Sequence, residues 1–167
     1  NFYHFIDALS TASPSNACIV TDAGSAFYVL GHAYKFKKNQ IFISSGSMGA
    51  MGYALPAANG AAVSKSKKVT ICVTGDGSLM TNIHELATSK EYNLNVKIFV
   101  INNDGYVSMR NTQNQFFEGH QVAEGGSTGV FIPSIEKIAK SYNLPYKKIN
   151  SEFNLLTNLK KIFLQSG

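Results

Sequence analysis

The chain has 167 residues, of which 44% are hydrophobic and 15% charged, a composition typical of one globular domain and not of a disordered chain. No apolar run approaches the roughly 20 residues that span a bilayer, and the first residues lack the basic and apolar regions of a signal peptide. We therefore expect a cytoplasmic protein without a membrane partner. The net charge of +5 comes from lysines spread over short groups, which favours a solvated surface over a nucleic-acid-binding groove.

Residues 1–15 predict an amphipathic helix that ends near Ser13-Pro14, and we interpret them as a helix or linker from a preceding domain. Residues 16–167 are predicted to form the main domain. Its first strand covers residues 17–21 and leads into a helix over residues 26–35. The helix start is a natural anion site, because backbone N–H groups there have no partner within the helix. The residues at this start are Gly24, Ser25 and Ala26.

Asp22 follows the first strand directly and has two interpretations. It is either a ligand or an acid that caps a helix or braces a loop, and the second reading is favoured. A short strand over residues 41–43 precedes a glycine-rich run, 44–58, and a helix predicted at 50–64. Alone, this run is ambiguous, because a helix of small residues packs on a sheet without any ligand. Cys18 and Cys72 lie in separate apolar runs, which predicts buried thiols and no disulfide.

Two predicted strands each end in a small polar cluster. Residues 69–73 precede Gly75-Asp76-Gly77-Ser78, and residues 96–101 precede Asn102-Asn103, with a turn and a helix at 81–92 between them. This order predicts a βαβ unit with parallel strands, whose carboxyl ends meet at one edge of the sheet. A carboxylate and a carboxamide flanked by glycines suit a divalent cation that carries a diphosphate. Glu85 is too far along the helix to join them and is read as a surface or interface residue.

Residues 106–130 have little periodicity and many polar, aromatic and glycine residues, which indicates a substrate-facing loop or lid. The candidates to face a substrate are Tyr106, Met109, Arg110 and His120. A helix at 135–142, a strand at 146–149 and a helix at 152–165 complete the chain. Five strands alternating with helices predict an α/β fold, namely a doubly wound, mainly parallel sheet with helices on both faces. The sequence has no P-loop pattern, and no G-x-G-x-x-G opens its first helix, so a generic nucleotide-binding domain has no support.

The paired clusters Gly75-Asp76-Gly77-Ser78 and Asn102-Asn103 resemble the thiamine diphosphate motif, which begins with Gly-Asp-Gly and ends with Asn-Asn. The run 45–58 resembles the loop and helix before that motif in acetolactate synthase-like enzymes, and 21–24 resembles the end of their first strand. The resemblance covers about residues 17–149. It implies the C-terminal, pyrophosphate-binding domain of a thiamine diphosphate-dependent enzyme.

The resemblance also implies roles for single residues. Asp76, the Asn103 side chain and the Gly105 carbonyl would hold Mg²⁺. Contacts to the diphosphate would come from Gly24, Ser25, Ala26, Gly77 and Ser78, with Gly75 in the same motif. Met51 would support the bent cofactor, and the Gly49 carbonyl would accept a hydrogen bond from its aminopyrimidine.

In this family the glutamate that activates the cofactor comes from a separate pyrimidine-binding domain, on the same or another chain. The resemblance therefore implies a cofactor-anchoring part, inactive alone, of a homodimeric or homotetrameric decarboxylase or carboligase acting on a small 2-oxo acid. The sequence contains no Trp, which acetolactate synthases place shortly after the Asn-Asn pair, and Thr112 stands near that place. Two alternatives remain: a separate subunit of a two-chain decarboxylase of the sulfopyruvate or phosphonopyruvate type, and a non-catalytic domain that keeps the fold.

Overall fold

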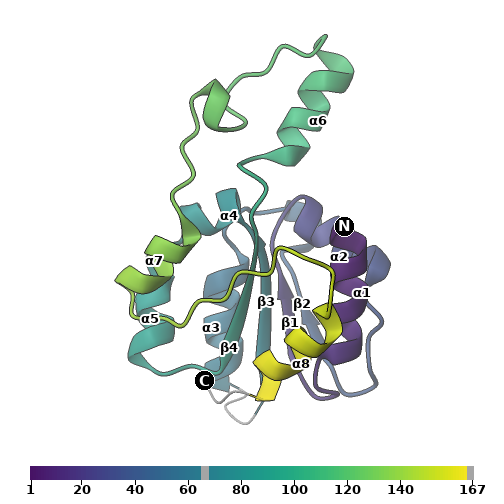
Figure 1. The fold of residues 1–167 in the computed structure, drawn as a ribbon, viewed down its shortest axis with the longest axis vertical. Coiled ribbons are helices and arrows are strands. Elements are labelled where there is room, and N and C mark those ends of the chain that lie inside the picture. Colours follow the sequence, from purple (N-terminus) through teal and green to yellow (C-terminus); the bar gives the residue numbers. More distant parts are fainter. Residues whose placement is uncertain (65–67, 165–167) are drawn as a thin grey trace.

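A computed structural model describes residues 1–64 and 68–164 of the chain (Figure 1). Four parallel strands form one sheet in the order β2-β1-β3-β4. Their bounds are β1 (Cys18–Thr21), β2 (Ile41–Ile43), β3 (Thr70–Gly75) and β4 (Val96–Ile101). The register pairs Val20 with Ile43 on one side and with Cys72 on the other. The predicted parallel, doubly wound α/β architecture is confirmed.

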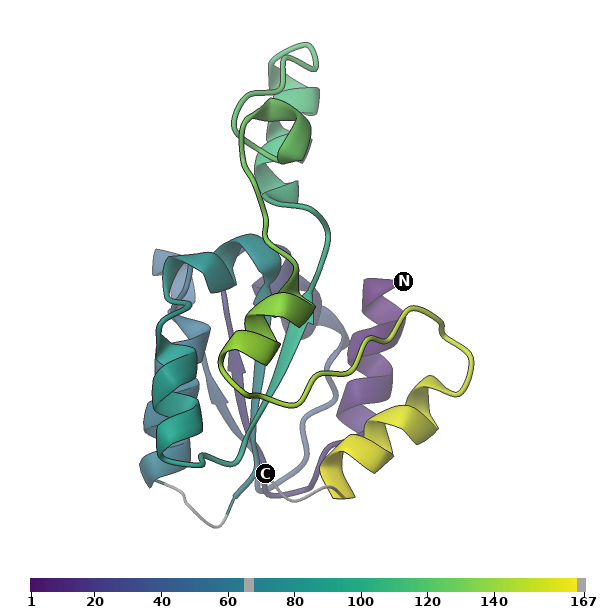
Figure 2. The same ribbon diagram turned by 60° about the vertical axis from the view of Figure 1, so that its left-hand side comes forward.

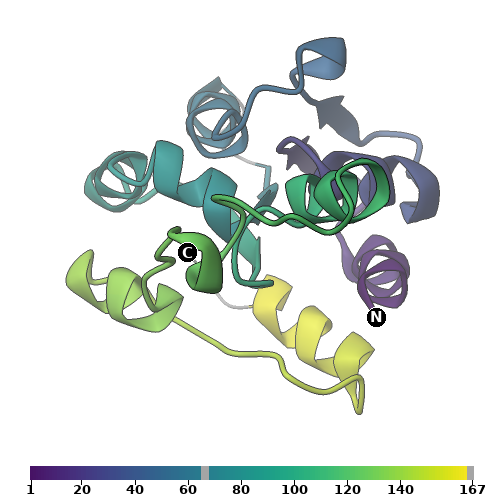
Figure 3. The ribbon, with the colours of Figure 1, turned by 90° about the horizontal axis from the view of Figure 1, so that it is seen from above.

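Helices cover both faces of the sheet, as Figures 2 and 3 show from the side and from above. One face carries α1 (Phe2–Ala12), α2 (Ser25–Ala33) and α8 (Leu155–Leu164). The other carries α3 (Ala54–Ser64), α5 (Glu85–Glu91) and α7 (Ile135–Ser141). The remaining helical elements are α4 (Asp76–Thr81), α6 (Val107–Phe116) and the 3₁₀ turns η1 (Gly46–Met48) and η2 (Gly126–Thr128). None of the helices in the described part of the chain is both long and apolar enough to cross a membrane.

The core follows the two-residue period of the strands, because successive side chains point to opposite faces of a sheet. Ile19, Ile71 and Val73 pack with α1, α2 and α8, whereas Cys18 and Cys72 pack under α3 with Val20. Both thiols are buried and neither is in a disulfide, as predicted. Burial raises the pKa of the Cys72 thiol far above its usual range, and the nearby Asp22 charge raises it further, so this thiol stays protonated.

The fifth predicted strand, at residues 146–149, is wrong. Pro145 has no N–H, Asn143 adopts a positive φ of 53°, and no backbone hydrogen bond joins residues 145–150 to another described segment. The segment instead crosses in front of β4 towards α8 (Figure 1). The sheet therefore ends at β4, because residues 146–149 run across it and not alongside it.

Two local predictions also need correction. The expected turn at Gly75-Asp76-Gly77-Ser78 is the start of helix α4, which follows β3 without a gap. The helix predicted at 81–92 is shorter, because α4 ends at Thr81, a turn occupies residues 82–84, and α5 covers Glu85–Glu91. Residues 107–116, expected as a loop, form helix α6. This helix buries none of its residues, so it lacks the apolar periodicity by which a helix is recognised in a sequence.

Other boundaries shift less. The strands predicted at 41–43 and 96–101 are confirmed at those bounds. Helix α3 begins at Ala54, later than the predicted start at residue 50, because η1 and a turn occupy the preceding residues. Helix α8 begins at Leu155 and not at residue 152. Its predicted end at Gln165 lies outside the described residues.

Candidate functional site

The candidate site lies where the strand order changes direction. From β1 the chain moves to β2 on one side, and it then returns to place β3 and β4 on the other side. Open α/β sheets bind ligands at such a switch point, outside the carboxyl ends of the strands. Helix α2 begins after β1 and α4 begins after β3, so both helix starts face this edge from neighbouring strands.

Asp76 is fully buried at the end of β3 and is held by backbone N–H groups. Its Oδ2 accepts hydrogen bonds from Asn103 N at 2.9 Å and Asp104 N at 2.7 Å, and a longer one from Gly105 N at 3.3 Å. Its Oδ1 accepts from Gly77 N at 2.8 Å. These bonds join the end of β3 to the loop after β4. The predicted meeting of the two polar clusters is therefore confirmed.

The Asn103 amide lies between two oxygen atoms. One of its terminal atoms is 3.1 Å from Gly105 O and 3.1 Å from Asp76 Oδ1. With nitrogen at this position the amide donates to both oxygens. With oxygen there, three oxygens converge at about the spacing of adjacent ligands around a small octahedral cation with bonds of 2.0–2.1 Å. No cluster of three His, Cys, Asp or Glu side chains occurs elsewhere in the described residues to offer another metal site.

The start of α2 offers unpaired donors beside this cluster. Gly24 precedes the helix with a φ of +61°, and within the described residues the N–H groups of Ser25 and Ala26 have no acceptor. In the neighbouring helix α4, Ser78 is buried and its N–H also has no acceptor in the described chain. Backbone N–H groups at a helix start bind anions because they and the helix dipole both favour negative charge.

Asp22 braces the loops around the site. Its Oδ1 accepts from Ala23 N and Gly52 N, both at 2.9 Å, and its Oδ2 accepts from Thr74 Oγ1 at 3.0 Å and Ala54 N at 3.2 Å. The carboxylate therefore caps the start of α3 from outside the helix and ties it to β1 and β3. The favoured interpretation of Asp22 as a brace is confirmed.

Gly52 fixes the segment that carries Gly49 and Met51. Its carbonyl accepts from Asn82 Nδ2 at 2.9 Å, and a side chain at this position would overlap Thr81 Oγ1. Gly49 and Met51 are both exposed, on the connection between β2 and α3. Their roles towards the aminopyrimidine stay predictions.

The four candidate substrate-facing residues occupy different places. The Tyr106 ring packs against Gly77, where a Cβ would approach Tyr106 Cε1 to 2.4 Å. Met109 is 42% exposed on α6. Arg110 pairs with Glu124 and donates from Nη2 to Asp104 O at 3.0 Å, so the structure gives it partners within the chain. His120 is exposed and lines a hollow with Phe116 and Phe117.

One buried residue of the site region, Glu124, was not predicted from the sequence. It is buried although it lies in the glycine-rich stretch 118–130. Its position in that stretch matched no motif, and its burial depends on partners distant in the chain. Glu85 accepts a hydrogen bond from Asn59 Nδ2 at its carbonyl, between α3 and α5, which agrees with the interface reading.

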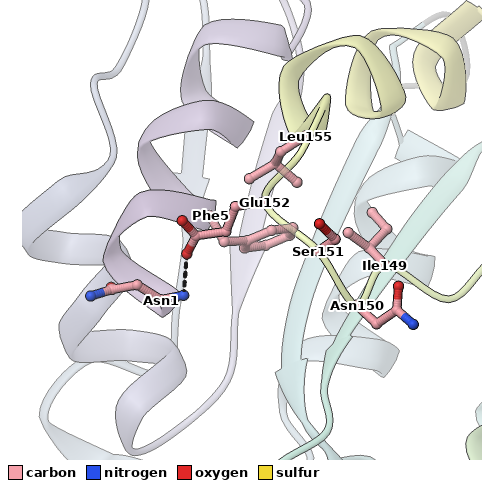
Figure 4. A pocket seen from close by; sticks show the side chains of 7 residues that line it. All are labelled: Asn1, Phe5, Ile149, Asn150, Ser151, Glu152 and Leu155. Carbon is pink, nitrogen blue, oxygen red and sulfur yellow. Dashed lines mark hydrogen bonds and ion pairs between the residues drawn. The ribbon is translucent and has the colours of Figure 1, made fainter.

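A second hollow lies between the start of α1 and residues 149–155 (Figure 4). There the Asn1 nitrogen lies 2.5 Å from Glu152 Oε1, and His4 Nδ1 lies 2.9 Å from Glu152 Oε2. None of the residues predicted for the cofactor lines this hollow.

Comparison with known proteins agrees with the fold and the motif. The family described as "Thiamine pyrophosphate enzyme, C-terminal TPP binding domain" matches residues 22–167. The chain belongs to this family, whose cofactor is also called thiamine diphosphate.

Among its relatives, the chain is 33% identical over 167 residues to the acetolactate synthase isozyme 1 large subunit of Escherichia coli K12, covering 99% of this chain and 29% of that protein. It is 36% identical over 148 residues to a probable acetolactate synthase large subunit of Methanococcus aeolicus, covering 87% and 24%. The chain therefore spans less than a third of the length of these relatives. It is an acetolactate synthase-like thiamine diphosphate-binding domain.

A solved structure has the same fold. The thiamine diphosphate-dependent 4-hydroxybenzoylformate decarboxylase of Rhodococcus jostii RHA1 matches with a TM-score of 0.82 at 21% identity, covering 98% of this chain and 30% of that one.

Proposed function

We propose that this chain anchors Mg²⁺ and thiamine diphosphate in an acetolactate synthase-like enzyme that decarboxylates or joins 2-oxo acids. The observation that carries the proposal is that one terminal atom of the Asn103 amide lies 3.1 Å from Asp76 Oδ1 and 3.1 Å from Gly105 O. A carboxylate, an amide oxygen and a carbonyl are hard ligands, as Mg²⁺ prefers.

The residues present fit the ion and the diphosphate together. Asp76 supplies a negative charge. Its Oδ2 accepts hydrogen bonds from the loop after β4, whereas its Oδ1 accepts one short hydrogen bond, from Gly77 N, and would also face the cation. Mg²⁺ has six coordination positions, and where a protein fills only a few of them, phosphate oxygens can bind at the others. The donors at Ser25, Ala26 and Ser78 would bind those phosphates from the two neighbouring helix starts.

When bound, thiamine diphosphate supplies the carbon nucleophile for breaking or forming the bond beside a substrate carbonyl. This chain's residues position it. We propose that the activating glutamate comes from a pyrimidine-binding domain of the same or another chain. We further propose that the complete protein is a homodimer or homotetramer, because the exposed Met51 and Gly49 leave the thiamine side of the site open on this chain.

Calorimetry on the complete protein that carries this chain tests the anchor. Thiamine diphosphate and Mg²⁺ are expected to bind together, with binding lost in EDTA. Asp76→Ala is expected to weaken cofactor binding by about 100-fold or more, because it removes a proposed ligand, and even the loss of a partner that only orients a ligand costs about 10–100-fold. Glu85→Gln is the matched control, since Glu85 lies on α5 away from the cluster, and it should bind normally. An Asp76→Ala protein that bound Mg²⁺ and cofactor as well as the control would contradict the metal assignment.

A further inference from the structure

Residues 104–132 form an arm that leaves the carboxyl edge of the sheet and returns to it (Figure 1). The arm contains α6 and η2, and α6 buries none of its residues. Gly105 and Gly125 are buried in this segment, and Glu124 is its buried charged residue, only 1% exposed. Burying a carboxylate is costly unless it is paired and hydrogen-bonded. The arm therefore keeps this charge in place through specific partners.

Arg110 joins the two halves of the arm at its base. Its Nε pairs with Glu124 Oε2 on the returning half, and its Nη2 donates to Asp104 O, 3.0 Å away, on the outgoing half. Thr128 Oγ1 lies 3.3 Å from the other Glu124 oxygen, Oε1. The planar guanidinium can hold both halves at once because its donors point in fixed directions.

The backbone of Glu124 reaches the proposed metal site itself. Its carbonyl accepts a hydrogen bond of 2.7 Å from Tyr106 N. This N–H belongs to the same planar peptide group as the Gly105 carbonyl, and in a trans peptide the two point in opposite directions. Holding the N–H on Glu124 therefore fixes where the Gly105 oxygen points. Gly105 also has a φ of +114°, and a Cβ there would lie 2.3 Å from Glu124 O, so the contact requires glycine.

We propose that Arg110 and Glu124 are positioning residues that hold the Gly105 carbonyl in place for the bound cation. The proposal rests on the proposed function, since it needs Gly105 O to be a ligand. A positioning pair differs from a purely structural ion pair in one respect: its loss must weaken Mg²⁺ binding and not only the stability of the fold. Partners that orient metal ligands typically contribute 10–100-fold to metal affinity.

The test measures Mg²⁺ binding by calorimetry, at saturating thiamine diphosphate, on the metal-stripped complete protein. Glu124→Gln keeps the shape of the side chain and removes its charge, and is expected to weaken Mg²⁺ binding about tenfold or more. Arg110→Gln should act similarly, while Arg110→Lys, which cannot bridge both halves, should be intermediate. Glu118→Gln is the matched control, because Glu118 is an exposed acid of the same arm. It is expected to stay within twofold of the original protein.

A second variant separates positioning from folding. Gly125 has an extended backbone with a φ of −169°, so alanine is allowed there, but its Cβ would approach both Arg110 Nη2 and Asp104 O to 2.8 Å. Gly125→Ala therefore pushes the two halves of the arm apart without removing a charge. It is expected to weaken Mg²⁺ binding and to speed hydrogen exchange of the Tyr106 amide.

Three outcomes decide the matter. If the original protein binds Mg²⁺ and Asp76→Ala does not, but Glu124→Gln and Gly125→Ala bind it normally, the positioning role is wrong and the proposed function stands. If the original protein does not bind Mg²⁺ with the cofactor, the proposed function itself fails. If Glu124→Gln lowers the unfolding midpoint while the folded protein keeps its Mg²⁺ affinity, the pair is structural only, and the proposal is overturned.

Discussion

Two buried aspartates, Asp22 and Asp76, each follow one of two neighbouring strands, but they have different hydrogen-bond partners. Asp22 follows β1, and its four described hydrogen bonds all come from groups that brace loops, including the start of α3. Asp76 follows β3, and its Oδ2 accepts hydrogen bonds from the loop after β4. Its Oδ1 accepts from Gly77 N and also lies 3.1 Å from the Asn103 amide, which is 3.1 Å from Gly105 O. Residue type and place in the topology are the same. The difference is that Asp76 Oδ1 also lies beside the Asn103 amide, whereas both oxygens of Asp22 bond only to groups that brace loops.

Burial alone does not distinguish a carboxylate proposed as a metal ligand from one that braces loops. Asp22 is 2% exposed and Asp76 is fully buried. A brace shares its oxygens among several segments and holds them together without any ligand. An anchor keeps one oxygen beside other oxygens, an arrangement that favours a cation.

The largest effect is expected at Asp22. Asp22→Ala leaves several buried donors without their acceptor, and the free energy of unfolding should fall by about 3–5 kcal/mol, since each such loss costs about 1–3 kcal/mol and the effects are not additive. Urea unfolding of the complete protein, without cofactor, measures it. An Asp22→Ala protein as stable as the original would remove the distinction between brace and anchor.

The next effect concerns Asp76 and appears only with ligand. Thiamine diphosphate and Mg²⁺ at 100 times their dissociation constant should stabilise the original protein by about 2.7 kcal/mol. Asp76→Asn keeps an acceptor for the N–H groups of the loop after β4 but loses the charge, so we expect it to gain almost none of this stabilisation. Thermal unfolding with and without ligand makes the measurement, and equal ligand-induced shifts in the two proteins would contradict the anchor.

Two glycines precede α3, and one of them, Gly52, donates to Asp22. Gly52 and Gly49 both have positive φ, of +77° and +55°, but a Cβ on Gly52 would lie 1.9 Å from Thr81 Oγ1, whereas one on Gly49 meets nothing within 4 Å. Gly52→Ala should therefore destabilise the fold by about 2 kcal/mol more than Gly49→Ala, the range of overpacking effects. Denaturant unfolding of the two variants compares them. Similar losses would mean that the segment before α3 is not fixed by α4.

The smallest effect is expected away from both aspartates, at Tyr34. Burial raises the pKa of this tyrosine above its ordinary value of 10.0, and the hydrogen bonds with Ser13 and Gln40 offset this only in part. The unfolded chain then loses the proton first, so the contribution is fully present below pH 10 and is lost as pH rises through the folded-state pKa. Stability measured above pH 10 should fall more steeply in the original protein than in Tyr34→Phe. The difference should not depend on cofactor.

Much of the site region was predictable from local patterns, and the failures have local causes. Short runs rich in β-branched and aromatic residues placed the strands at 41–43 and 96–101, although β2 is largely exposed and only Phe99 of β4 is buried. The same criterion placed a strand at 146–149 wrongly, since a short run with Tyr146 and Ile149 predicts extended structure but does not say whether a neighbour pairs with it. Helix α6 was missed for the opposite reason, as an exposed helix leaves no apolar stripe.

The amino-acid sequence alone was enough to predict the parallel α/β fold, the meeting of Asp76 with Asn103 and the resemblance to thiamine diphosphate-binding domains. These depend on strand order and on a motif whose halves follow neighbouring strands. The partners of Asp22, and the pairing of Arg110 with Glu124, became visible only in the folded structure. The physical reason is that a charged side chain takes its role from partners brought close by folding, and no spacing along the chain records them.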